Sequence, residues 1–97
     1  MYKIIFLPEA KNDLGLVRQY LSLYYKNTAK TFFGLLKKSI DTLKENPCMY
    51  QKFPERPLYR RLVIRDYLVF YKVNDIKNAI EIHRILHSSR EIERYIP

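Results

Sequence analysis

Residues 59–73 of the chain read YRRLVIRDYLVFYKV, and residues 79–87 read AIEIHRILH. Aromatic and β-branched residues dominate both stretches, which is typical of β-strands. Arg65-Asp66 divides the first stretch in two, and residues 74–78 separate it from the second. Because both connections are short, neighbouring strands must pair antiparallel. The sequence therefore predicts a three-stranded meander with strands at 59–64, 67–73 and 79–87.

Helical periodicity precedes the meander. Apolar residues recur every three or four positions over residues 10–24, after Pro8-Glu9, a pair that suits the first turn of a helix. A second run with this period covers residues 29–43 and ends at Asn46-Pro47. The short connection between the runs predicts an antiparallel helix hairpin. The side chains expected to be buried are Leu14, Val17, Leu21, Phe32, Leu36, Ile40 and Leu43.

The remaining segments complete the predicted order. Residues 2–7 (YKIIFL) are expected to form a strand that Pro8 stops. Residues 47–58 contain three prolines and are expected to form a surface loop. Ser88 or Ser89 could cap a short final helix. The order is then β-α-α-β-β-β-α.

This order predicts one domain over residues 1–97, because a chain of 97 residues is too short for two. The helix hairpin must bury its apolar stripe, and one face of the sheet is the only large partner. The fold class is therefore α+β, with an N-terminal strand and a helix hairpin packed on one face of an antiparallel sheet. The opposite face is expected to stay largely exposed and to carry the function.

The charge of the chain limits its partners. Lys and Arg total 18 against 10 Asp and Glu, a formal net charge of +8, which favours nucleic acid, an acidic protein segment or a membrane surface. No apolar stretch approaches the roughly 20 residues that span a membrane. The single Cys48 excludes an internal disulfide and agrees with a cytoplasmic location. One Cys and two His argue against structural zinc, and no cofactor-binding motif is present.

Cations gather at the start of the meander, at Arg56, Arg60, Arg61 and Arg65. They could contact an anion or could form a solvated rim. Neighbouring residues of a strand point to opposite faces, so Arg60 and Arg61 cannot both lie on the open face. Arg61 is in phase with Tyr59 and Val63, the less apolar set, and is therefore assigned to the open face.

Two histidines lie on the last predicted strand. His87 ends that strand close to Arg90, and the two would suit a phosphate or a carboxylate, although a histidine there could also be a packed or capping residue. His83 is in phase with His87 but about 13 Å away along a strand, too far to share a metal ion. Metal-free RNA cleavage needs a base, an acid and cations for the phosphorane charge. Side chains of the right types are His87, Arg61, Arg90, Lys52 and Tyr95.

The segments YRRLVIRDYLVFYKV (59–73) and IEIHRILHSSREIERYI (80–96) resemble the C-terminal half of the RelE/ParE toxin superfamily. PEAKNDL (8–14) and LKENP (43–47) are similar to its helical hairpin, so the resemblance covers nearly the whole chain. It implies a toxin of a bacterial type II toxin–antitoxin module, neutralised within a hetero-oligomer by an acidic antitoxin. It also implies a curved sheet whose first strand lies at or beside an edge.

The superfamily divides by target. RelE-like members cut mRNA on the ribosome, whereas ParE-like members poison DNA gyrase and cut no RNA. The YRR, VFYKV and RILH segments resemble the ParE side more closely, and Ser88-Ser89-Arg90-Glu91 stands where many relatives have Gly-Arg-Arg-Asp. A gyrase poison is therefore expected first, an mRNA endonuclease second, and a basic binding module or a toxin that has lost activity third.

The resemblance and the residue types together give two sets of candidate site residues. If the chain is a nuclease, the catalytic residues are His87, Arg61, Arg90 and Tyr95. The candidates for target binding are Lys52, Arg56, Arg65 and Arg84. None of the three functions requires a metal or a cofactor.

Overall fold

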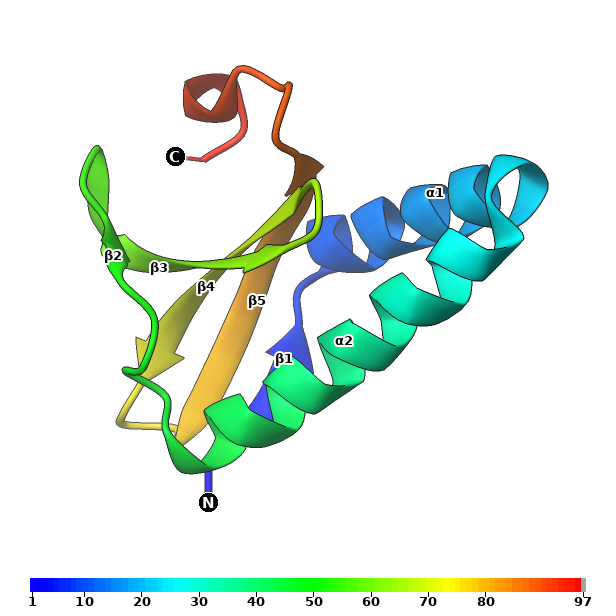
Figure 1. Cartoon of the computed structure of the whole chain (residues 1–97). Helices are drawn as coiled ribbons and strands as arrows, with labels where there is room; N and C mark the ends of the chain where they lie inside the picture. Colours follow the sequence, from blue (N-terminus) through cyan, green and yellow to red (C-terminus); the bar gives the residue numbers. More distant parts are fainter. Residues whose placement is uncertain (97) are drawn as a thin grey trace.

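The computed structural model describes residues 1–96 and confirms the α+β class, with a helix hairpin on one face of a five-stranded sheet (Figure 1). The elements are β1 (Lys3–Phe6), α1 (Pro8–Tyr24), α2 (Lys26–Glu45), β2 (Lys52–Phe53), β3 (Arg56–Ile64), β4 (Tyr67–Asn74), β5 (Ala79–His87) and the 3₁₀ helix η1 (Ile92–Arg94). None of the described helices is long and apolar enough to cross a membrane.

The strands lie in the order β1-β5-β4-β3-β2. The meander is antiparallel as predicted, and β1 forms an edge. However, β1 pairs parallel with β5, so the sheet is mixed rather than wholly antiparallel. The helix hairpin returns the chain to the end of the sheet where β1 began. Because β5 also starts at that end, it runs in the direction of β1 and antiparallel to β4 (Figure 1).

Two local predictions were wrong. The expected loop over 47–58 contains β2 and the start of β3, which pair antiparallel through Lys52 with Arg60 and Phe53 with Arg56. The expected final α-helix is only the 3₁₀ turn η1. Neither serine caps it: Glu91 precedes it without a side-chain cap, and the Ser89 hydroxyl lies 2.8 Å from Nδ1 of His87.

The sheet is covered on both faces, which corrects the expectation of a bare second face. The main core lies between helices and sheet; of the seven side chains predicted there, five are buried and Leu14 and Ile40 are half-buried. On the other face the chain folds back after β5, and Ile96 is buried there (Figure 1). The buried members of this second core are Phe53, Tyr59, Phe70, Leu86 and Ile96.

A register shift between β4 and β5 changes which face each histidine occupies. Phe70 pairs with Arg84, but the next residue, Tyr71, pairs with Ile82, so His83 is an extra residue on β5. An extra residue inverts the two-residue alternation of a strand. His83 therefore lies against Tyr59 on the second-core face, whereas His87 packs on Tyr67 at the helix-covered face. The prediction that the two histidines are in phase was wrong.

Candidate functional site

A groove of about 1040 Å³ runs between the tip of the helix hairpin and the C-terminal end of β5. Its helix wall carries three exposed tyrosines, Tyr20, Tyr24 and Tyr25. The centroid of the Tyr20 ring lies 5.2 Å from that of Tyr24 and 5.9 Å from that of Tyr25. The opposite wall contains five of the residues that the sequence singled out, namely His87, Arg90, Tyr95, Arg65 and Arg84.

His87 is half-buried beside the ring of Tyr67 and bonds to the turn that follows it. Its Nδ1 accepts the backbone N–H of Ser89 at 3.1 Å and lies 2.8 Å from the Ser89 hydroxyl. Since the backbone N–H can only donate, Nδ1 of this ring is an acceptor, and the neutral ring carries its proton on Nε2. Only Nε2 is then free to serve a ligand in the groove.

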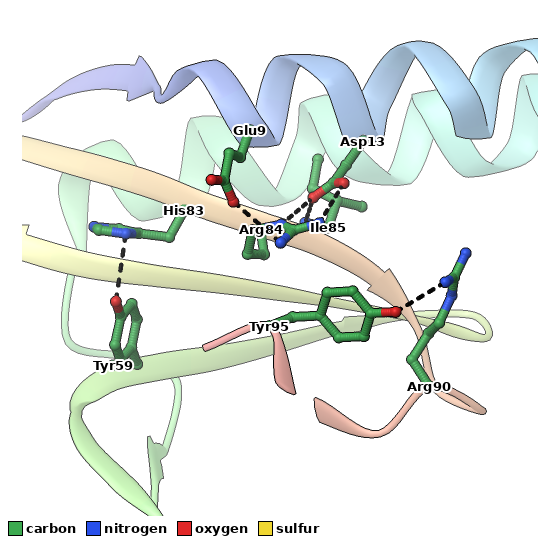
Figure 2. Close-up of polar contacts among 8 residues, drawn as sticks. All are labelled: Glu9, Asp13, Tyr59, His83, Arg84, Ile85, Arg90 and Tyr95. Atoms are coloured by element: carbon green, nitrogen blue, oxygen red, sulfur yellow. Dashed lines mark hydrogen bonds and ion pairs between the residues drawn. The ribbon is translucent and has the colours of Figure 1, made fainter. Parts of the chain in front are cut away.

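Tyr95 joins two arginines on the same wall. Its hydroxyl accepts a hydrogen bond from Arg90 at 3.1 Å, and its ring lies under the guanidinium groups of Arg84 and Arg90 at 5.2 and 5.7 Å (Figure 2). Arg90 itself is exposed. One cation of the groove is thus available to an anionic ligand while its position is supported by an aromatic ring.

Arg84, one of the predicted target-binding residues, lines the groove and is held in place by α1. Asp13 accepts two hydrogen bonds from its guanidinium at 2.8 and 2.9 Å, and Glu9 accepts a third at 3.1 Å (Figure 2). Asp13 also accepts the backbone N–H of Ile85 at 3.0 Å, which satisfies β5 where β1 no longer pairs with it. The hydrogen bonds that Arg84 donates to Asp13 are the main cause that raises the pKa of Arg84. This cation therefore supports the fold, with little of its surface free.

Sequence reasoning missed Asp13, which is only 6% exposed. A signal was present, because Asp13 lies three residues after Ala10 and four before Val17, on the buried stripe of α1. A carboxylate on such a stripe needs a cationic partner.

Arg61 lies apart from the groove, so the proposed nuclease set is divided. It is on the second-core face as predicted, pairs across the sheet with Phe70 and covers the ring of Phe53 at 5.7 Å. His87 faces the helix-covered side. The groove thus contains His87, Arg90 and Tyr95 but not the fourth predicted member.

The other candidate cations are spread along the β2–β3 side and the β3–β4 turn. Lys52 is exposed on the edge strand β2, and Arg56 is partly exposed and donates to the neighbouring carbonyl of Glu55. Arg65 is exposed in the turn with a positive φ of 56°. Arg60, at the rim, donates to the carbonyl of Tyr50 at 2.8 Å and so fixes the loop before β2. Among residues 1–96 there is no group of three or more His, Cys, Asp and Glu that could hold a metal ion.

His83 gives the fold a pH dependence. Burial, followed by the charge of Lys72, lowers the pKa of His83, and Glu81 and Glu9 only partly oppose this. Tyr59 lies 3.5 Å from Nδ1, and Nε2 is buried without a hydrogen-bond partner. The ordinary histidine pKa is about 6.5. As the pH falls through that value, the unfolded chain takes up a proton that the folded protein resists.

We therefore expect His83 to make its full contribution to the free energy of unfolding above about pH 6.5. This contribution should decrease as the pH falls from there towards the pKa of His83 in the folded protein. Urea unfolding of the wild type and of His83→Gln at about pH 7.5 and about pH 5.5 measures it. The variant should lose less stability between these conditions, and His87→Gln is the matched control. An equal loss in the wild type and His83→Gln would contradict the assignment.

Comparison with models of protein families identifies the family that the chain resembles. A family model described as the ParE toxin of the type II toxin–antitoxin system parDE matches residues 4–92. No individual curated protein matches the chain. The matched range contains both helices, the meander, His87 and Arg90, and it ends before Tyr95.

Proposed function

The chain belongs to the ParE toxin family of type II toxin–antitoxin systems, and from this premise we propose that it arrests growth by poisoning DNA gyrase. The membership makes it the toxin component of such a module, with an antitoxin as its partner. Gyrase as the molecular target is what we propose beyond this membership. We place the toxin and its hetero-oligomeric antitoxin complex in the cytoplasm, where gyrase acts.

The observation that carries this proposal is the separation of Arg61 from His87. In metal-free RNA cleavage the 2′-hydroxyl attacks the phosphate and the 5′-oxygen leaves, which needs proton-transfer groups and phosphate-binding cations around one phosphate. Here the register shift at Tyr71 directs His87 to one face of the sheet, while Arg61 covers Phe53 on the other. In addition, Nδ1 of His87 is already bonded to the turn at Ser89. A toxin that acts by binding does not need these groups to converge.

A RelE-like mRNA endonuclease is the second candidate, and one observation favours it. His87, Arg90 and Tyr95 line the same groove, and Nε2 of His87 remains free for a ligand. In that function His87 would transfer the proton and Arg90 would hold the phosphate. Such a residue typically contributes about 10²–10⁴-fold to the rate.

The variant His87→Gln separates the two functions. As a gyrase poison, the variant should still arrest growth and should still trap gyrase in cleaved-DNA complexes in a supercoiling assay, because no proton transfer is required. Primer extension on cellular mRNA after induction should show no new cleavage site for wild type or variant. Arg90→Gln is tested beside it as a second variant, since it removes a positive charge from the groove and leaves both histidines unchanged.

The opposite pattern would overturn the proposal. If wild-type induction produces mRNA cleavage sites that disappear with His87→Gln while the variant stays folded, the chain is a nuclease. If purified wild-type toxin leaves gyrase supercoiling unchanged, gyrase is not the target.

Association with the antitoxin should depend on salt. We expect an acidic antitoxin, because the toxin carries a net charge of +8. Electrostatic attraction accelerates encounter and is screened over about 8–10 Å at physiological salt. The association rate constant, measured by surface plasmon resonance over a salt series, should therefore fall as salt rises, while the dissociation rate constant changes little. An association rate that stays constant across the series would contradict the charge argument.

A further inference from the structure

Exposed lysines form a line along one side of α2. Lys26, Lys30 and Lys37 are separated by four and seven residues, spacings that place them on the same side of a helix. The three span about 16 Å at 1.5 Å per residue. Figure 1 shows that the hairpin lies beside the sheet with its outer side uncovered by any other element.

Helix α1 adds two cations to this side. The guanidinium of Arg18 covers the ring of Phe33 at 4.3 Å, and Phe33 lies between Lys30 and Lys37 on α2. Arg18 therefore sits next to the lysine line, and Lys11 precedes it by two helical turns. All five side chains are exposed. We call Lys11, Arg18, Lys26, Lys30 and Lys37 the basic ridge.

The charges of the ridge are not used within the protein. In the part of the chain that the structure describes, none of the five forms an ion pair. The carboxylates of α1 are directed to the sheet, where Glu9 and Asp13 hold Arg84 (Figure 2). The acid nearest in sequence to the ridge on α2, Asp41, pairs with Lys44. Among the ion pairs of the hairpin, the acids thus serve Arg84 and Lys44, and none of them neutralises a cation of the ridge.

Each helix also has a glycine inside the ridge. Gly15 follows Lys11 by four residues and precedes Arg18 by three, and Gly34 holds the same position between Lys30 and Lys37. Glycine inside a helix destabilises it relative to alanine. A methyl group at either position would meet open space, so packing within this protein does not require the glycines. Without side chains at these positions, the helix backbone between the cations is open to close approach.

We propose that the basic ridge binds the phosphate backbone of duplex DNA. The ligand is a regular polyanion with one phosphate per about 3.4 Å of each strand, so the lysine line on α2 alone covers roughly five phosphates of a strand. The proposal rests on the proposed function, because a toxin that poisons gyrase meets its enzyme on duplex DNA. Contacts with the backbone give affinity without sequence preference.

The test is fluorescence anisotropy of a labelled, random-sequence DNA duplex with the full chain over a salt series. The ridge variant Arg18→Gln/Lys30→Gln/Lys37→Gln is compared with Lys3→Gln/Lys77→Gln/Arg94→Gln, which has the same net charge and changes exposed residues elsewhere. Each lost phosphate contact reduces the slope of log affinity against log salt by about 1. The ridge variant should therefore lose about 3 from the slope, and the control less than 1. When the salt rises from 50 to 200 mM, the affinity for DNA falls by some factor in each protein, and this factor should be roughly 60 times larger for the wild type than for the ridge variant.

Each result has one meaning. Equal losses in the ridge and control variants would show that only net charge acts, and would overturn the ridge. Normal DNA affinity with weakened antitoxin binding in the ridge variant would assign the surface to the antitoxin instead. Gyrase poisoning by a wild type that binds no duplex would overturn the ridge alone. Ridge-dependent duplex binding without gyrase poisoning would support the ridge and overturn the proposed function.

Discussion

Replacing Asp13 with alanine is expected to lower the free energy of unfolding by about 3–5 kcal/mol, the range for breaking a buried ion pair by removing one partner. Two losses act together. The Arg84 side chain, 16% exposed, loses two hydrogen bonds and its buried counter-charge. The backbone N–H of Ile85 loses its acceptor in a buried position. Urea unfolding followed by circular dichroism measures the change.

Glu9→Ala is the matched control because Glu9 binds the same guanidinium from an exposed position, with 74% of its side chain accessible. Ion pairs of this kind contribute about 0–1 kcal/mol. The two carboxylates should therefore differ several-fold in their effect. A loss below about 1 kcal/mol for Asp13→Ala would mean that water replaces the carboxylate at Arg84, and that the pair does not hold α1 on β5.

Replacing Leu36 with alanine is expected to cost about 2–5 kcal/mol, the usual range for a large-to-small change in a packed core. Leu36 is 4% exposed and lies in the main core between α2 and the sheet. The substitution removes the favourable burial of the leucine side chain. It also leaves a cavity that relaxation of the neighbouring side chains closes only in part. The midpoint of urea unfolding should move down with little change in slope.

The neighbouring Leu35 provides a control of identical chemistry, because it is 38% exposed on the same helix. Leu35→Ala should change stability by less than about 1 kcal/mol. Similar losses at the two positions would show that the buried stripe of α2 is assigned to the wrong side. A greater loss at Leu35 would have the same meaning.

The fold could largely be predicted because its signals are local. The spacing of apolar residues in 10–24 and 29–43 identifies both helices, and the short connections of the meander leave antiparallel pairing as the only geometry. The weaker elements could not be found in this way. The strand β2 has only two residues, and its pairing with β3 includes a register irregularity, so no periodic pattern marks it.

The candidate site could be predicted only in part. His87, Arg90 and Tyr95 share a groove, as expected for residues close to one another along the chain. Asp13, which holds Arg84, comes from 71 residues upstream, and only the docking of α1 beside β5 brings the two together. The burial of the second sheet face depends in the same way on Ile96, the end of a segment that lacks a regular pattern.

Residue spacing and composition alone established the helix hairpin, the meander, the position of Arg61 on the second-core face and the positive charge. Tertiary structure settled the parallel pairing of β1, the covering of the second face and the separation of His87 from Arg61. The reason lies in the pairing of β4 with β5. One extra residue at His83 reverses the faces to which all later side chains of β5 point. The position of such a shift depends on how β4 pairs with β5. The sequence pattern of β5 alone therefore does not reveal it.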